Sequence, residues 1–154
     1  MSSLLLNTVE VDLVRQFLGH RAQFLVLGGH AVQFYGHLRP AKDLDLFVDT
    51  AGENPQRVVS ALAAIQISHL DLTTERLSKS NQKIRLGGWY NTELLTTVSG
   101  LSFESAYAAA TLSNEQGLSI PVISREHLIS SKRVLGRAQD LEDVVALEKL
   151  AVAV

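Results

Sequence analysis

The sequence contains no cysteine and no long hydrophobic run. The absence of cysteine excludes disulfide scaffolds, thiolate metal sites, iron–sulfur clusters and cysteine nucleophiles. No apolar stretch approaches the roughly 18 residues that a membrane-spanning helix needs. The first residues also lack the basic region of a signal peptide. We therefore expect a protein that works in the cytoplasm, without a membrane partner.

An excess of charge of one sign is also missing, because 14 Lys and Arg residues face 16 Asp and Glu residues and give a net charge of −2. This balance argues against a dedicated nucleic-acid or membrane-surface protein, although it leaves room for a local basic patch. Hydrophobic residues make up 46% of the 154 residues, and neither a repeat nor a flexible linker interrupts them. We expect a single domain over residues 1–154 with its own core.

Hydrophobic periodicity and turn residues predict an α/β (α+β) domain with a small mixed sheet flanked by helices. Helices are expected over residues 8–20, 30–37, 54–67, 103–110, 125–135 and 140–152, and strands over 24–27, 43–49, 82–86, 93–98 and 118–123. Pro121 favours an edge position for the last strand. The domain then divides into an N-terminal helix (1–21), a sheet core with the active site (22–123) and C-terminal helices (124–154).

Residues 28–45 combine features of a site that handles phosphate. Gly28 and Gly29 end an apolar strand, and a short helix follows, whose first N–H groups can face an anion. Asp43 and Asp45 alternate with leucines on the next strand, so their carboxylates point the same way. The aspartates alone are more typical of an exposed strand edge. Their spacing from the glycines favours a Mg²⁺ and anion site for phosphoryl or nucleotidyl transfer.

The stretch GGHAVQFYGHLRPAKDLDLFV, residues 28–48, resembles the first motif of the polymerase-beta-like nucleotidyltransferase superfamily. It is most similar to the small prokaryotic branch related to abortive-infection and toxin–antitoxin nucleotidyltransferases. That branch also carries a Lys, a Gly-Arg and an Asp-x-x-Asp near its C-terminal end. Here SKRVLGRAQDLEDVVAL supplies them as Lys132, Gly136, Arg137, Asp140 and Asp143. With the middle stretch ELLTTVSGLSFESA, the likeness covers roughly residues 22–149.

The resemblance implies a nucleotidyltransferase fold with C-terminal helices and an enzyme that depends on Mg²⁺ (or Mn²⁺). Such an enzyme moves a nucleoside monophosphate from ATP or another NTP to a hydroxyl on an RNA 3′ end or a protein. The implied metal ligands are Asp43, Asp45 and Glu93, which are also catalytic. Lys132 would meet the triphosphate charge, and Asp140 would act as a positioning or base-like group.

Candidate nucleotide contacts are Gly28, Gly29, His30, Arg39, Lys42 and Arg137. His30 either touches a phosphate or makes a structural hydrogen bond at the start of its helix. Arg39 and Lys42 either bind phosphate or neutralise the aspartates. Acids in a first helical turn complement the helix dipole, which is the favoured role for Asp143 and an even alternative for Asp140, itself a plausible N-cap.

The turn around Trp89 and Tyr90 is a further candidate. These aromatic residues follow two glycines between two predicted strands. They either stack on a nucleotide base or cap the core, and the second role is the more common one for aromatic side chains.

Two functions therefore compete. The first is a nucleotidyltransferase, acting in a toxin–antitoxin or defence system. The alternative is a catalytically weak or inactive binding module of the same fold, an antitoxin or regulatory subunit. Such a module would pair with a cognate protein, and an oligomer is possible. The first helix and the apolar tail at 150–154 either form that interface or pack within the chain.

Overall fold

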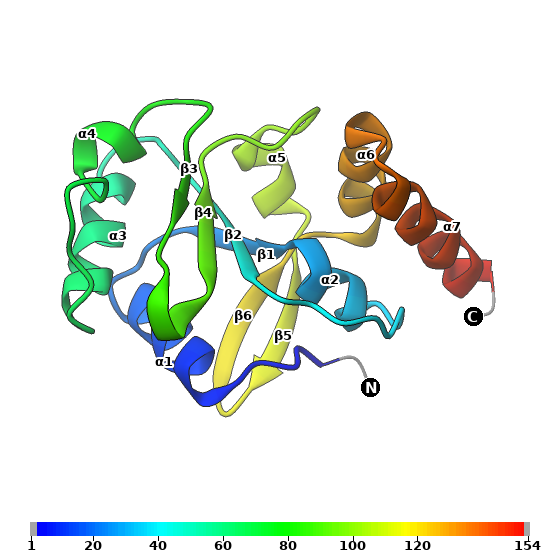
Figure 1. The fold of residues 1–154 in the computed structure, drawn as a ribbon, viewed down its shortest axis with the longest axis horizontal. Coiled ribbons are helices and arrows are strands. Elements are labelled where there is room, and N and C mark those ends of the chain that lie inside the picture. The colour runs from blue at the N-terminus through cyan, green and yellow to red at the C-terminus, as the bar shows by residue number, and fades with distance from the viewer. Residues whose placement is uncertain (1–2, 153–154) are drawn as a thin grey trace.

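Helices and strands alternate along the chain in the computed structural model, which describes residues 3–152 (Figure 1). The elements are α1 (Thr8–Gly19), β1 (Phe24–Leu27), α2 (Gly28–Phe34), β2 (Leu44–Val48), α3 (Asn54–Ala63), α4 (Thr74–Leu77), β3 (Lys83–Arg85), the 3-10 turn η1 (Gly88–Tyr90), β4 (Thr92–Leu95), α5 (Phe103–Ala108), β5 (Thr111–Glu115), β6 (Leu118–Val122), α6 (Arg125–Leu135) and α7 (Ala138–Val152). The last two residues of the apolar tail lie outside the described residues.

Six strands form one mixed sheet in the order β3-β4-β2-β1-β6-β5, so the predicted fold class is confirmed. Strand β1 runs antiparallel to β2 and parallel to β6, while β2 runs parallel to β4. The edge position predicted for Pro121 is wrong, because β6 lies between β1 and β5. The register pair between β6 and β1 is Val26 with Val122, just after the proline, so this short ladder tolerates a residue without an N–H group.

The edge beyond β6 is β5, a strand that the sequence did not predict. Its residues TLSNE are mostly exposed, and Ser113 is the buried one among them. A polar edge strand has no hydrophobic alternation to reveal it, because only one of its faces touches the core and then at few positions.

The two faces of the sheet differ in how they are covered. On one face, side chains such as Phe24, Leu46 and Leu94 share a core with Phe17 of α1 and Leu62 of α3. Burying each of these large side chains contributes about 1.5–3 kcal/mol. This core fixes the register of the central strands, since a slip by one residue would turn its side chains to the other face.

On the opposite face, a smaller cluster joins Leu25 and Phe47 to α5, where the ring of Phe47 packs edge-on against Phe103 at 5.1 Å. The alternation of Asp43 and Asp45 with leucines predicts that the second face of β2 is exposed to solvent. It is wet only at its Asp45 end, because α5 covers the Phe47 end. The polar side chains lie on this same face of the sheet, in the part that α5 does not cover.

Helices α6 and α7 stand together at one end of the molecule, opposite α3 and α4 (Figure 1). The Ser124 side chain caps α6 by accepting from the His127 N–H at 3.1 Å, and Gly136 ends the helix in the left-handed conformation. Both ends of this helix agree with the predicted range 125–135. Within residues 3–152 no helix is long and apolar enough to cross a membrane.

Candidate active site

A row of register-matched residues crosses the open face of the sheet. Asp45 on β2 is opposite Glu93 on β4, and Glu93 is opposite Arg85 on β3. On its other side Asp45 is opposite Leu27, the last residue before Gly28. Because residues in register point to the same face of a sheet, these side chains lie next to one another. The predicted third acid, Glu93, thus comes from the strand beside the Asp-x-Asp strand.

Asp45 carries a charge that its surroundings oppose. Burial, together with the nearby carboxylates of Glu93 and Asp43, raises the pKa of Asp45 from 3.8 to about 7. The cations of Lys83 and Lys132 lower it, but they do not outweigh those three effects. The geometry therefore concentrates negative charge at one place on the sheet.

Two cations of strand β3 lie against the outer acids. Arg85 donates to both oxygens of Asp43 at 3.0 and 3.2 Å, and the Lys83 ammonium lies 3.4 Å from Glu93. Sequence reasoning missed both residues as parts of the site. Their signal was the alternation Lys83-Ile84-Arg85, which places two cations on one face of a strand.

The donor set suits a hard divalent cation, although it is not gathered into a metal cluster. Within residues 3–152 no group of three His, Cys, Asp or Glu side chains converges closely enough to hold a metal ion. The outer acids, Asp43 and Glu93, face Arg85 and Lys83 instead, whereas Asp45 forms no ion pair within residues 3–152. Carboxylate oxygens are the ligands that Mg²⁺ and Mn²⁺ prefer, so the chemistry fits once the outer acids turn from their cations.

Gly28 leaves room for the Asp45 carboxylate. A Cβ atom at position 28 would overlap Asp45 Oδ2 and lie 3.0 Å from its Cγ, and the backbone has a φ of +67° there. At Gly29 a Cβ would lie 2.8 Å from the Cβ of Ala41, in the loop that leads to β2. Both glycines therefore allow the β1–α2 turn to approach β2 closely.

We expect Gly52→Ala to lose about 1–2 kcal/mol of stability because of its positive φ, and Gly28→Ala to lose more, because its added methyl group would also overlap the Asp45 carboxylate. They should differ in function, because an added methyl group at position 28 displaces the Asp45 carboxylate, whereas nothing lies within 4 Å at position 52. Chemical denaturation and Mg²⁺–nucleotide binding measure the two effects. Equal nucleotide binding by both variants would contradict this role of Gly28.

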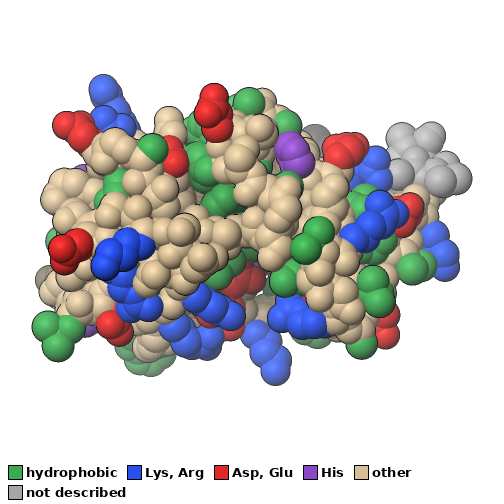
Figure 2. All heavy atoms as spheres, turned by 90° about the horizontal axis from the view of Figure 1, so that it is seen from above, with side chains coloured by type: hydrophobic (Ala, Val, Ile, Leu, Met, Phe, Trp, Pro, Cys, Tyr) green, Lys and Arg blue, Asp and Glu red, His purple; other side chains and the backbone are tan. Residues whose placement is uncertain are grey.

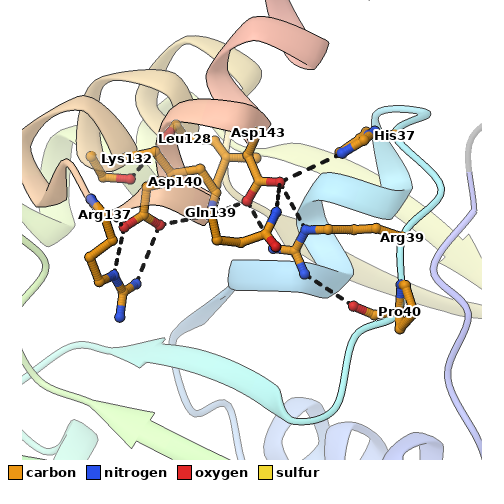
Figure 3. Close-up of polar contacts among 10 residues, drawn as sticks. His37, Arg39, Pro40, Leu128, Lys132, Arg137, Gln139, Asp140 and Asp143 are labelled. Atoms are coloured by element: carbon orange, nitrogen blue, oxygen red, sulfur yellow. Dashed lines mark hydrogen bonds and ion pairs between the residues drawn. The ribbon is translucent and has the colours of Figure 1, made fainter.

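A second group of charged residues faces Asp43, Asp45 and Glu93. It lies on α6, α7 and the loop after α2 (Figure 3). Its centre is Asp143, which is fully buried and accepts hydrogen bonds from Arg39 Nε and Nη2, both at 2.8 Å. Lys132 Nζ lies 2.9 Å from the same carboxylate, and Gln139 donates to it at 3.1 Å. Burial opposes the charge, but the hydrogen bonds from Arg39 and Lys132 outweigh it and lower the pKa of Asp143 to about 2.

The favoured role of Asp143, a first-turn acid that only complements the helix dipole, is therefore wrong. Its carboxylate joins α7 to the preceding helix α6 and to the loop after α2, which is distant in the sequence. Of the two roles considered for Arg39, phosphate binding or charge neutralisation, the bidentate contact favours neutralisation, with the acid on α7 rather than with Asp43 or Asp45.

Lys132 and Asp140 lie deeper than the sequence suggested. The Lys132 ammonium is buried between Asp143 and Asp140, 3.4 Å from the latter. Burial opposes ionisation of Asp140, but the Arg137 hydrogen bonds and the Lys132 charge lower its pKa. A carboxyl with a lowered pKa is a weak base, so the geometry favours the positioning role for Asp140. It lies in the third position of α7 and is not the N-cap.

Arg137 and Lys42 are the most accessible cations of the cleft. The Arg137 side chain is 72% exposed and is oriented by a bidentate contact with Asp140, at 2.6 and 3.3 Å (Figure 3). Lys42 is exposed beside Asp43, and within the described part of the chain it forms no ion pair. Both can contact an anion that enters the cleft.

His30 is not part of this cleft, which corrects its assignment as a nucleotide contact. Its ring is buried, with Nδ1 3.1 Å from the Asp43 carbonyl oxygen and Nε2 3.6 Å from Glu10 on α1. The structural alternative holds: His30 ties the start of β2 to α1. Its position directly after two glycines gave no sign of this, because the partner on α1 is distant in sequence.

The cleft has a volume of about 600 Å³ and is lined by Gly28, Gly29, Arg39, Lys42, Asp43, Asp45, Glu93, Lys132, Arg137 and Asp140. That volume suits a nucleotide-sized ligand. A larger hollow of about 850 Å³ lies between α3 and α4, but it holds neither the carboxylate row nor the cations of α6 and α7. The convergence of charged groups, and not size, identifies the candidate site.

No family model and no curated protein matches this chain. Several solved structures share its fold, two of which are nucleotidyltransferase-like proteins. An antigenic nucleotidyltransferase-like protein from Paracoccidioides brasiliensis aligns with a TM-score of 0.60 at 14% identity, over 94% of this chain and 78% of that one. The lincomycin-bound lincosamide antibiotic adenylyltransferase LnuA aligns with a TM-score of 0.56 at 14% identity, over 96% and 99%. The predicted nucleotidyltransferase fold is confirmed.

Proposed function

We propose that this chain, which has the nucleotidyltransferase fold, transfers a nucleoside monophosphate from an NTP to a hydroxyl group in a Mg²⁺-dependent reaction. The observation that carries the proposal is the register of Asp45 with Glu93 on the open face of the sheet, directly beside Gly28. Carboxylates on two neighbouring strands, facing a cleft of nucleotide size, are the arrangement that this chemistry needs.

Asp43, Asp45 and Glu93 would hold Mg²⁺ or Mn²⁺. When bound, the cation supplies positive charge to the reacting phosphate and makes the attacking hydroxyl more acidic. Glu93 takes the place of the aspartate that is more usual at this position, and its carboxylate lies 3.4 Å from Lys83 on β3. The Asp45 pKa of about 7 supports the proposal, because it reflects a carboxylate that a cation would stabilise.

The cations of the opposite wall would bind the triphosphate. Arg137 and Lys42 can reach it directly, and Lys132 lies behind them between its two acids. Positive charge held there stabilises the charge that develops on the departing pyrophosphate. Asp140 and Asp143 fix the orientation of Arg137, Lys132 and Arg39, so that little rearrangement is needed during the reaction.

The proposal also concerns the identity of the acceptor that carries the hydroxyl group. The family resemblance favours an RNA 3′ end or a protein hydroxyl, with a role in a toxin–antitoxin or defence system and a cognate protein partner. One solved neighbour is an adenylyltransferase of a lincosamide antibiotic, so ATP as donor and a small-molecule hydroxyl belong among the substrates to test.

Melting curves with ATP, GTP, CTP and UTP, each with and without Mg²⁺, test the proposal. A ligand at about 100 times its dissociation constant adds roughly 2.7 kcal/mol of stability. For a chain of this size we expect a rise of roughly 5–10 °C with at least one nucleotide, and only with Mg²⁺ present. The double variant Asp43→Asn/Asp45→Asn should lose the rise. No rise with any nucleotide would favour the alternative, a binding module of the same fold.

A further inference from the structure

Helix α7 has an outer side that the rest of the described chain leaves exposed. Figure 1 shows the helix lying along α6 at one end of the molecule and extending away from the sheet. Leu141 is 48% exposed and Val145, one turn further along, is 53% exposed. At this end of the molecule, Figure 2 shows hydrophobic side chains exposed among charged side chains of both signs. The outer side of α7 is therefore a mixed surface and not a purely polar one.

The exposed residues form a shallow groove along this side of the helix. It is lined by Leu141, Glu142, Val145, Ala146 and Lys149. Glu142 and Lys149 lie about two helical turns apart, one before and one after the apolar pair of Val145 and Ala146. The groove thus has an apolar middle between an acid and a base.

Neither charged group of the groove forms an ion pair within residues 3–152. Glu148, on the same helix, pairs with Arg133 at 2.7 Å, and the acids of α7 that border the cleft also face cations. Glu142 and Lys149 are exposed and have no such contact in this part of the chain. Both charges are therefore available to a second molecule.

We propose that the outer side of α7, from Leu141 to Lys149, binds a second copy of this chain, with the two helices antiparallel about a two-fold axis between Val145 and Ala146. Positions at equal distances from such an axis face each other, so Glu142 of each copy faces Lys149 of the other. The apolar residues meet at the centre of the contact, and an ion pair forms on either side of them. This arrangement does not depend on the proposed activity.

The charge pattern favours an antiparallel second copy over other occupants. In a parallel pair each residue would face its own counterpart, so Glu142 would oppose Glu142 and Lys149 would oppose Lys149. A membrane surface or a nucleic acid presents charge of one sign, whereas this groove presents both signs. The antiparallel pair matches both charges without any further protein.

The proposed contact leaves the candidate active site open. Asp140 and Asp143 lie on the other side of α7, where they are buried against Lys132. The groove and the cleft share no lining residue among the residues that the structure describes. Association through the groove therefore covers none of the residues that line the cleft.

The first helix, by contrast, packs within the chain. Leu13, Val14 and Phe17 of α1 are fully buried, so its apolar side belongs to the core of this copy. Leu150, where the apolar tail begins, lies against Gly36 after α2. Of the two roles considered for these segments, packing within the chain holds for α1 and for Leu150.

The exposed tryptophan of η1 is a separate apolar feature. Trp89 is 87% exposed, so the core-capping role favoured from sequence is wrong for this residue, whereas Tyr90 does pack against the core. The turn packs on α1, and the Tyr90 hydroxyl donates to the Ile65 carbonyl at 3.5 Å, on the sheet face opposite the carboxylates. Trp89 is therefore not placed to stack on a base in the cleft, and residues 87–91 carry no charge that would identify a partner for it.

An exchange of charges tests the antiparallel contact. Glu142→Lys leaves two bases along the groove, and Lys149→Glu leaves two acids. Either variant alone should self-associate at least about tenfold more weakly than the wild type, because the symmetric pair changes both contacts at once. An equal mixture of the two should associate as the wild type does, since each contact then joins unlike charges again. Both side chains are exposed, so we expect both variants to fold.

Sedimentation velocity measures the association. One copy has a mass of 16.8 kDa, and the wild type should approach twice this mass as its concentration rises from about 1 to about 300 µM, a range that suits a small interface. A dye on one variant distinguishes the mixed pair from either variant alone.

Matched controls are Glu75→Lys and Lys79→Glu, two exposed charges at α4, at the opposite end of the molecule (Figure 1). Neither control should change self-association. A wild type that remains monomeric over the whole range overturns the inference. Charge variants of α7 that associate as the wild type does also overturn it, because another surface then forms the contact. A mixture that fails to recover association overturns the antiparallel register, and with it the inference.

Discussion

Asp45→Asn is expected to make the metal-free protein more stable while strongly weakening the Mg²⁺-dependent nucleotide binding that we propose. Asp45 is half-buried among groups that oppose its charge, and an amide of the same shape carries no charge to oppose. The same change removes a carboxylate oxygen from the proposed metal site, which should weaken Mg²⁺–nucleotide binding at least about 100-fold. A residue kept only for stability would not show these opposite effects.

The stability that Asp45→Asn gains should depend on pH. The pKa of Asp45 is about 7 in the folded protein against 3.8 as the ordinary value, so the folded state binds this proton more tightly. The carboxyl therefore costs no stability below about pH 4, and the cost grows as the pH rises to about 7. The groups that face it are Asp43, Glu93, Lys83 and Lys132. Above pH 7 the expected gain in the variant is about 2–4 kcal/mol.

Melting in EDTA between about pH 5 and pH 8 measures this gain, which corresponds to roughly 5–10 °C at the upper end. Asp71→Asn is a suitable control, because Asp71 is an exposed acid that faces Arg76 on the surface. A metal-free Asp45→Asn protein that melts at or below the wild-type temperature at pH 8 would show that Asp45 is not under electrostatic strain.

Asp143→Asn is expected to have the largest effect on stability, a loss of about 3–5 kcal/mol of unfolding free energy. The buried carboxylate is the shared partner of Arg39 and Lys132, and an amide leaves both cations without a full counter-charge. Chemical denaturation measures the loss. Asp12→Asn, which breaks an exposed pair with Arg15, should cost about 0–1 kcal/mol.

Acid adds a second readout for Asp143. Its pKa of about 2 lies below the ordinary 3.8, so its contribution is complete above about pH 4 and is lost as the pH falls toward 2. The difference in unfolding free energy between the wild type and Asp143→Asn should decrease by about 2 kcal/mol over that interval. If this difference in unfolding free energy stays constant from pH 5 to pH 2, the variant disrupts packing and the Asp143 charge is not what stabilises the fold.

The local parts of this fold could be predicted from the sequence. The alternation of Asp43, Leu44, Asp45 and Leu46 indicates a strand with two carboxylates on one face, because the side-chain period of a strand is two. Ser124 and Gly136 mark the ends of α6 by their chemistry as caps. Such signals lie within a few residues of the structure that they specify.

The partners of those residues could not be predicted, because periodicity gives the face of a strand and not its neighbour. Nothing near Glu93 in the sequence indicates that Lys83 lies against it, and nothing near Asp143 indicates Arg39. Pro121 was misassigned for the same reason, since the edge strand β5 that covers β6 carries no hydrophobic pattern. His30 was misassigned because its ring turns to Glu10, a residue of another helix.

The contact between Arg39 and Asp143 joins positions 104 apart in the chain. Because of this separation, the two sides of the cleft can form at different times during synthesis. The six strands of the sheet end by Val122, so a chain that emerges from the ribosome can complete the sheet and expose its acids while α7 is still inside the exit tunnel. The cations that would meet a triphosphate are not yet held in place at that stage. On the proposed function, we therefore expect a chain whose α7 has not yet emerged to bind Mg²⁺–NTP more weakly than the folded domain does.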